Sequence, residues 1–241
     1  MNNEKMTASK IKIIKYLINH NFATKSTLSK ELGLSMPTVL SNVNELLEKG
    51  LLMEVGELES TGGRKARSIG INPIYARSVG VNITAHHVDM VMVNLGCQVE
   101  HRKRLSLPFA GDMAYCIRLA EEVHLFIEET KAEKLLGVGF SIPGIIDQEQ
   151  HLLLKSHALN VENFSLRLIE QNLNLPCYFE NDANAALLAE DPENCKNALY
   201  ISLSYTLGGA FCIDGQLYRG HNQRAGEFGH MILVPGGSKC Y

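Results

Sequence analysis

Apolar residues near the start of the chain recur at the spacing of an amphipathic helix. The sequence predicts a first helix with apolar residues on one side and lysines on the other, and Thr7 or Ser9 can cap its start. The apolar residues of the predicted buried side are Ile11, Ile14, Leu17 and Ile18. This pattern is typical of a helix that packs on a small core.

Two further helices are predicted, separated by a tight turn. The second runs from about Thr24, whose hydroxyl can cap it, to Leu32, and Gly33 ends it by adopting a left-handed conformation. Ser35 caps the third helix and places Pro37 in its first turn, where the missing N–H costs nothing. The predicted buried stripe of the third helix is Val39, Val43, Leu46 and Leu47.

Two helices joined by a glycine-containing turn form a helix-turn-helix, whose second helix inserts its N-terminal residues into the major groove of DNA. Hydroxyl and amide groups near the start of the third helix can bond base edges or phosphates. The predicted DNA-contacting residues are Ser35, Met36, Thr38, Ser41 and Asn42. A three-helix bundle with a solvated polar face is the alternative that these helices alone leave open.

A hairpin with a basic tip is predicted after the third helix. Strands are expected at 51–55 and 66–71, and the segment between them carries two glycines and two cationic side chains. Glycine permits close approach of the backbone to another surface, and positive charge attracts phosphates or a narrow minor groove. The DNA-contacting residues predicted here are Gly62, Gly63, Arg64 and Lys65. Beside a recognition helix this hairpin indicates a winged helix-turn-helix, whereas a hairpin whose charges only confer solubility is the alternative.

The pattern changes at Asn72-Pro73, where the proline disfavours continuation of the strand, so the domain boundary is placed there. Strands and helices then alternate, which predicts an α/β domain. Strands are expected at 78–84, 88–94, 99–105, 135–142 and 177–180, with helices at 112–131, at 163–173 and from Asp182. A second meander at 198–204, 209–213 and 216–218, with Asp214-Gly215 as a hairpin turn, suggests a duplicated unit.

Composition places the chain among ordinary globular proteins, because hydrophobic residues fill 45% of its 241 positions. The formal net charge is −3, but residues 1–78 carry 11 Lys and Arg against 7 Asp and Glu. The positive charge is therefore concentrated in the predicted DNA-binding part. No apolar run is long enough to span a membrane, and the six cysteines form no CxxC pair, so we expect a cytoplasmic protein with no membrane partner.

Four short motifs resemble those of the ROK family, which comprises bacterial repressors, open reading frames and sugar kinases. Residues 60–64 (STGGR) are similar to the wing signature of its regulators, and residues 142–147 (IPGIID), 180–185 (ENDANA) and 225–230 (AGEFGH) to its sugar-site motifs. The resemblance implies a winged helix-turn-helix at 1–72 followed by an actin-like ATPase (ribonuclease H-like) α/β domain at 73–241. Its first lobe would cover about 78–196 and its second about 197–241. The family's second lobe continues further, so a fragment or truncated protein with an incomplete second lobe is expected.

The resemblance also implies a sugar site. The residues that match the family's sugar-site motifs are Gly144, Asn181, Asp182, Glu227 and His230. Asp182 matches the catalytic base of the family's kinases, whereas its place at the start of a helix by itself favours an N-cap. The family's zinc is held by the histidine and three cysteines, of which only His230 and Cys240 have counterparts here. An incomplete zinc site with weak zinc binding or none is therefore expected.

Both phosphate-binding loops of the kinases are degenerate in this sequence. They have become Asn82-Ile83-Thr84-Ala85-His86 and Ser204-Tyr205-Thr206-Leu207-Gly208-Gly209, so side chains replace most glycines that let backbone amides surround phosphates. We expect no bound ATP and no catalysis, with Asp182 a vestigial base. The favoured hypothesis is a sugar-responsive regulator, a repressor of carbohydrate metabolism genes that binds operator DNA as a dimer or tetramer and responds to a sugar or sugar phosphate. A sugar kinase with a DNA-binding head is the alternative.

Overall fold

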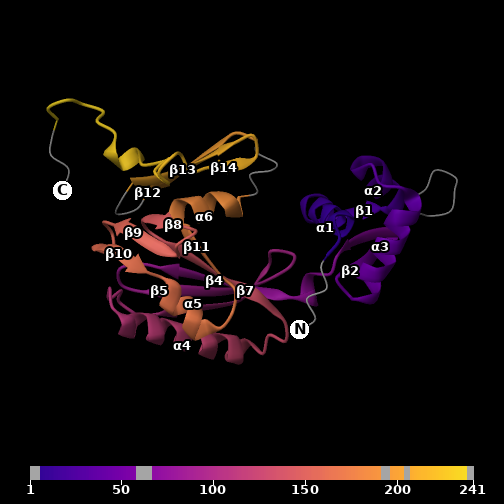
Figure 1. Ribbon diagram of the computed structural model, residues 1–241, viewed down its shortest axis with the longest axis horizontal. Helices are drawn as coiled ribbons and strands as arrows, with labels where there is room; N and C mark the ends of the chain where they lie inside the picture. The colour runs from indigo at the N-terminus through magenta and orange to yellow at the C-terminus, as the bar shows by residue number, and fades with distance from the viewer. Residues whose placement is uncertain (1–5, 58–66, 191–195, 204–206, 238–241) are drawn as a thin grey trace. The chain divides into compact units, whose positions relative to one another are not determined.

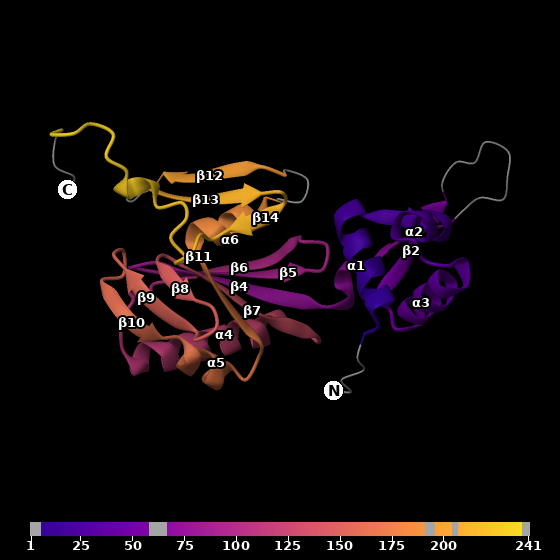
Figure 2. The same ribbon diagram turned by 45° about the horizontal axis from the view of Figure 1, so that its top comes forward.

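The computed structural model describes residues 6–57, 67–190, 196–203 and 207–237, which fall into two compact units (Figures 1 and 2). The first unit extends to Ser78 and includes the segments Val93–Glu100 and Ala132–Leu135. The second unit contains the remaining residues. The domain boundary expected after Asn72 stays a prediction. Within the described ranges, no helix combines the length and the apolar content that crossing a membrane requires.

The first unit is a winged helix-turn-helix. Its helices are α1 (Ala8–His20), α2 (Lys25–Leu32) and α3 (Met36–Glu48), and its antiparallel sheet has the order β1 (Phe22–Thr24), β3 (Arg67–Ile71), β2 (Leu52–Glu57). Thr24 and Ser35 cap α2 and α3 by accepting hydrogen bonds from Thr27 N and Thr38 N, as predicted. Gly33 adopts φ 62° between them, which confirms the predicted turn. The short strand β1 was not predicted.

The predicted buried side of α1 is confirmed only in part. Leu17 is buried and Ile14 packs on the core as predicted, but Ile11 and Ile18 are 42% and 56% exposed, and Ile13 is buried in their place. Apolar residues occur on more than one side of this helix, so their periodicity alone does not determine which side faces the core. Packing against α2 and α3 determines it. Thr7 occupies the N-cap position but its side chain makes no capping hydrogen bond.

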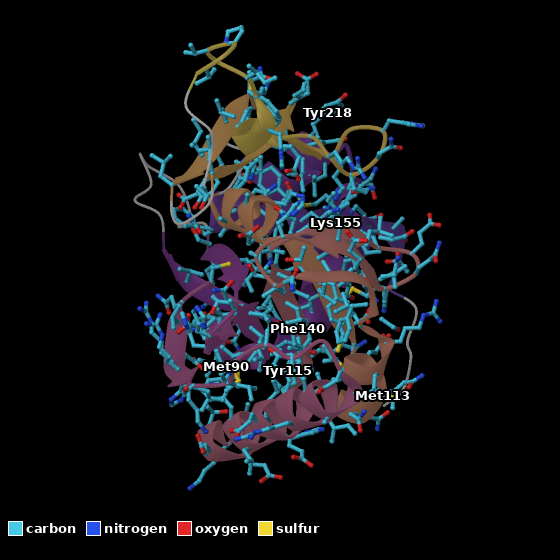
Figure 3. All side chains as sticks on the ribbon, turned by 90° about the vertical axis from the view of Figure 1, so that its left-hand side faces the viewer. Met90, Met113, Tyr115, Phe140, Lys155 and Tyr218 are labelled. Carbon is cyan, nitrogen blue, oxygen red and sulfur yellow. The ribbon has the colours of Figure 1, made fainter. Side chains whose placement is uncertain are left out.

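Most of a five-stranded sheet, of order β11-β7-β4-β5-β6, lies in the second unit. These strands are β4 (Arg77–Ile83), β5 (Val88–Asn94), β6 (Val99–Leu105), β7 (Leu135–Ile142) and β11 (Cys177–Asn181). Helices α4 (Met113–Thr130) and α5 (Arg167–Leu173) cover one face of this sheet (Figure 2). Met90 of β5 and Tyr115 of α4 lie in the layer between them (Figure 3). Asp112 caps α4 by accepting from Tyr115 N at 2.8 Å, as predicted.

A small antiparallel sheet lies between β7 and α5 in the sequence. It has the order β10 (Val161–Ser165), β9 (Leu152–Ser156), β8 (Ile145–Asp147), and none of these strands was predicted. The predicted helix at 163–173 is wrong at its start, because residues 163–165 belong to β10 and α5 begins at Arg167. Strands of three to five residues are too short for alternation to distinguish them from loops.

The predicted second meander is present as β12 (Ala198–Leu203), β13 (Leu207–Ile213) and β14 (Gln216–Tyr218). Asp214 and Gly215 both have positive φ, 52° and 76°, as the predicted hairpin turn requires. Helix α6 (Asp182–Ala189) packs on one face, where Ala183 and Leu187 contact Ala210 and Cys212. Beyond β14 the chain forms a short turn of helix, η2 (Phe228–His230).

Candidate functional site

All five residues matched to the family's sugar contacts line one cleft of about 500 Å³ in the second unit. Gly144 follows β7, and Asn181 and Asp182 lie at the junction of β11 and α6. Glu227 and His230 belong to the segment after β14. Because β7 and β11 are parallel neighbours, with Asn181 paired to Ile142, their carboxyl ends meet at the same edge of the sheet.

The side chain of Asn181 holds the backbone of the cleft together. Its Oδ1 accepts hydrogen bonds from Ala183 N at 3.0 Å and Asn184 N at 3.1 Å, and its Nδ2 donates to Gly144 O at 3.0 Å. Asn181 is therefore the N-cap of α6, and the alternative that Asp182 is the cap is wrong. The cap uses both lone pairs of Oδ1, and Nδ2 is bonded to Gly144 O, so Asn181 has a structural role in the cleft.

Capping by Asn181 leaves the Asp182 carboxylate facing the cleft as the first residue of α6. Burial raises the pKa of Asp182 above its ordinary value, while hydrogen bonds from the backbone N–H groups of Ala183 and Asp182 partly oppose this. A half-buried carboxylate of this kind can accept hydrogen bonds from hydroxyl groups of a ligand.

Gly144 allows the loop after β7 to lie directly on β9. Its φ is 139°, a conformation that side chains rarely adopt, and a Cβ at this position would lie 2.6 Å from Lys155 O. Only glycine therefore permits Pro143, Gly144 and Ile145 to form this wall of the cleft.

Glu227 and His230 face the cleft from its other side. Glu227 Oε2 lies 3.7 Å from His230 Nε2, and the His230 ring centroid is 5.9 Å from that of His157. No group of three or more His, Cys, Asp or Glu side chains among the described residues is arranged to hold a metal ion. Cys240 lies outside the described residues, so the incomplete zinc site stays a prediction and no step is derived through zinc.

The cleft also contains polar residues that the sequence did not single out. They are Lys155, Ser156, His157, Ser202, Gln223 and Arg224, together with Asn184 from within a quoted motif. Lys155 (Figure 3) and Ser156 belong to β9, a strand that was not predicted, and Lys155 Nζ donates to Glu162 Oε1 at 2.7 Å. The ENDANA motif was the only signal that could have indicated Asn184.

At the first degenerate phosphate loop, the chain turns between β4 and β5, and the backbone amides of Thr84, His86 and His87 are paired within the turn. Thr84 Oγ1 accepts from His86 N at 3.4 Å and from His87 N at 3.1 Å. Thr84 N and Thr84 Oγ1 both donate to His87 O. These N–H groups already have partners within the turn. Residues 204–206 of the second loop lie outside the described residues, whereas Gly208 and Gly209 are part of β13.

The predicted DNA surface of α3 is partly corrected. Ser35, Met36 and Ser41 are exposed, and Thr38 is half-buried with its hydroxyl 2.8 Å from that of Ser35. Asn42 is buried and its Nδ2 donates to Ser9 Oγ at 3.0 Å, so the prediction that it faces DNA is wrong. The hydrogen bond to α1 explains why a polar residue lies on the inner side of α3. The predicted wing residues Gly62, Gly63, Arg64 and Lys65 lie outside the described residues.

A winged helix-turn-helix followed by an actin-like α/β unit with a polar cleft defines a class of DNA-binding proteins related to sugar kinases. Comparison with family models agrees, because the winged helix-turn-helix DNA-binding model matches residues 6–53 and the ROK family model matches residues 78–241. The chain belongs to the ROK family.

Among curated proteins, the chain is 28% identical to the xylose repressor of Bacillus subtilis (strain 168) over 240 residues, which cover 95% of this chain and 61% of that protein. It is 24% identical to the DNA-binding transcriptional dual regulator NagC of Escherichia coli (strain K12), over 89% of this chain and 54% of the regulator. The chain thus spans about three fifths of the length of the curated relatives it matches.

Two solved structures show the same fold. A ROK family transcriptional regulator described as a homologue of the E. coli MLC protein superposes with a TM-score of 0.77 at 23% identity, over 96% of this chain and 62% of that one. A ROK hexokinase from Thermus thermophilus gives a TM-score of 0.57 at 26% identity, over 68% of this chain and 56% of the hexokinase. The match to the regulator covers more of this chain than the match to the hexokinase, and the additional residues include the winged helix-turn-helix.

Proposed function

We propose that this protein is a sugar-responsive transcriptional regulator that represses genes of carbohydrate metabolism. The observation that carries the proposal is the convergence of Gly144, Asp182, Glu227 and His230 on one cleft in a chain that begins with a winged helix-turn-helix. The xylose repressor and NagC, to which the chain is similar, are named as a repressor and a DNA-binding regulator.

Two polar side chains on each side of the cleft suit a ligand with many hydroxyl groups. Asn181 and Asp182 line the first side, and Glu227 and His230 line the second. A sugar or sugar phosphate that binds two conformations of the protein unequally shifts the population between them. The exposed Ser35 and Ser41 and the basic segment at 62–65 supply contacts to operator DNA, and a dimer or tetramer contacts two or more half-sites.

Two measurements test this proposal. A thermal-shift screen of sugars and sugar phosphates is expected to reveal a ligand that raises the melting temperature, because binding only to the folded form stabilises it. Footprinting on the DNA beside its own gene is expected to show a protected palindrome that the same ligand releases. Absence of both a stabilising sugar and a protected site would contradict the proposal.

The alternative is a sugar kinase with a DNA-binding head, and Asp182 is the observation in its favour. A carboxyl group with a raised pKa in a sugar cleft is suited to accept a hydroxyl proton. The internally paired amides of the turn at residues 84–87 weigh against it, because phosphoryl transfer depends on holding and neutralising the phosphates. The test is incubation with ATP, magnesium and a panel of hexoses. Turnover above background would establish the kinase, and we expect turnover at the background rate.

A further inference from the structure

The segment that carries Glu227 and His230 packs directly on β13. A Cβ on Gly209 would overlap the ring of Phe228, and a Cβ on Gly226 would overlap the carbonyl oxygen of Gly209. A Cβ on Gly229 would lie 2.7 Å from Leu207 O. Backbone therefore packs on backbone at Gly226 and Gly229, and the Phe228 ring packs on the backbone of Gly209.

Gly209 is the central residue of this packing. The Phe228 ring lies over its Cα and meets the Phe211 ring edge-on, with 5.1 Å between ring centroids. The neighbouring Gly208 differs, because a Cβ there would have ordinary contacts at 3.9 Å with Ala183 and Ser202. The requirement for glycine is thus specific to position 209.

The packing fixes two side chains of the cleft. Glu227 lies between Gly226 and Phe228 in the chain, and His230 N donates to Glu227 O at 3.2 Å. Phe228 N donates to Gly226 O at 2.7 Å and Met231 N to Phe228 O at 3.1 Å, so the segment moves as one hydrogen-bonded turn. A methyl group inserted under Phe228 would displace Glu227 and His230 together.

We propose that Gly209 is a positioning residue for the second side of the cleft. This glycine, which could be taken as a remnant of a phosphate loop, holds Glu227 and His230 at the distance from Asp182 that a ligand needs. The functional part of the inference rests on the sugar site proposed above, whereas its structural part, the placement of residues 226–231, is independent of any ligand.

Amide hydrogen exchange of the full chain tests the structural part without a ligand. Gly209→Ala is expected to raise the exchange rate of Phe228, His230 and Met231 amides at least tenfold, because the turn loses its support. Gly139→Ala is the matched control, since Gly139 lies in β7 with nothing within 4 Å of a Cβ, and it should leave these amides unchanged. Unchanged exchange in Gly209→Ala would overturn the inference.

A double-mutant cycle with Phe228→Ala supplies a readout that general destabilisation of β13 would not give. Phe228→Ala removes the ring that a Cβ at position 209 would meet. In the Phe228→Ala background, the increase in exchange at His230 and Met231 caused by Gly209→Ala is therefore expected to be at least threefold smaller than in the wild-type background. A Cβ at position 209 would also lie 2.9 Å from Tyr200 O, and this contact is present in both backgrounds and cancels in the cycle. Equal effects of Gly209→Ala in both backgrounds, on exchange or on the yield of folded protein, would contradict the inference.

Ligand titrations distinguish this inference from the proposed function. With a sugar that stabilises the wild-type protein, Gly209→Ala is expected to weaken binding about tenfold or more, and Gly139→Ala less than twofold. Equal sugar affinity in both would overturn the positioning role while leaving the sugar site intact. If no sugar in the panel binds the wild-type protein, the proposed function is refuted. The exchange data would still show whether Gly209 fixes the position of residues 226–231. A non-hydrolysable ATP analogue that binds wild type and is lost in Gly209→Ala with unchanged exchange would restore the phosphate-loop explanation.

Discussion

Arg219 Nη2 donates to Glu180 Oε2 at 2.5 Å and so joins the end of β14 to the end of β11. Glu180 Oε1 also accepts from Asn184 Nδ2 and from Asn181 N, both at 3.0 Å. Arg219 O accepts from Ala225 N at 3.1 Å, which closes the loop that carries Gln223 and Arg224. The ion pair thus joins the two sides of the cleft through residues that do not themselves line it.

Removing this ion pair should destabilise the second unit. The Glu180 and Arg219 side chains are 17% and 35% exposed, so Arg219→Met leaves a poorly solvated carboxylate and is expected to cost about 1–3 kcal/mol of unfolding free energy. Urea denaturation measures the difference. The control is Arg67→Met, whose pair with Glu54 is largely exposed and should contribute under about 1 kcal/mol. An Arg219→Met effect no larger than the control would show that the pair is not stabilising.

Asn181 should be important for folding as well as for binding. Asn181→Ala removes the cap of α6 and the bond to Gly144 O, and a loss of about 1–3 kcal/mol is expected in urea denaturation. Asn181→Asp keeps the oxygen that caps α6 but turns a carboxylate oxygen toward Gly144 O, so a loss of stability in this variant reports the contact with Gly144. Asn172→Ala, which removes an exposed hydrogen bond to Leu168 O, is the control and should change stability little.

The raised pKa of Asp182 gives a pH dependence of defined sign. The protonated carboxyl is favoured by folding, so its contribution to stability is present below the ordinary pKa of 3.8 and is lost as pH rises through the folded value. Asp182→Asn should therefore raise the melting temperature at pH 7, and the difference should shrink toward pH 4. A difference that is constant between pH 4 and pH 7 would contradict this cause.

Two adjacent positions of α3 should give opposite phenotypes. Asn42→Ala removes the buried hydrogen bond to Ser9 and is expected to lower stability by about 1–2 kcal/mol, measured by thermal unfolding. Ser41→Ala removes an exposed hydroxyl and should leave stability unchanged while weakening binding to operator DNA severalfold. If Ser41→Ala left DNA affinity unaltered, α3 would not present this residue to DNA.

Local signals in the sequence predicted much of the fold. Thr24, Ser35 and Asp112 were predicted as caps, and each accepts the backbone hydrogen bond expected of it, because capping depends only on neighbouring residues. Val88–Asn94 was predicted with the observed bounds because an apolar, valine-rich run between two short turns is typical of a strand, and its burial alternates in the structure. The buried side of α1 and the inward Asn42 depended on contacts between distant residues, which periodicity does not encode.

Only part of the site could be predicted from the sequence. The motifs indicated both Asn181 and Asp182 as site residues. That Asn181 has a structural role and Asp182 faces the cleft follows from the hydrogen bond between Asn181 and Gly144, which are 37 positions apart. Lys155 and His157 could not be predicted, because they depend on β9, whose five residues give no clear alternation. The prediction that residues 62–65 contact DNA rests on the sequence alone, because they lie outside the described residues.

Asn181 both caps α6 and lines the cleft, which has an evolutionary consequence. Any substitution there that altered ligand preference would also weaken the start of α6, so this side of the cleft is constrained by folding. The loop from Gly220 to Arg224 carries exposed residues, two of which line the cleft and are free of that constraint. Divergence of this protein toward a new ligand should therefore accumulate in the loop, while the asparagine stays invariant.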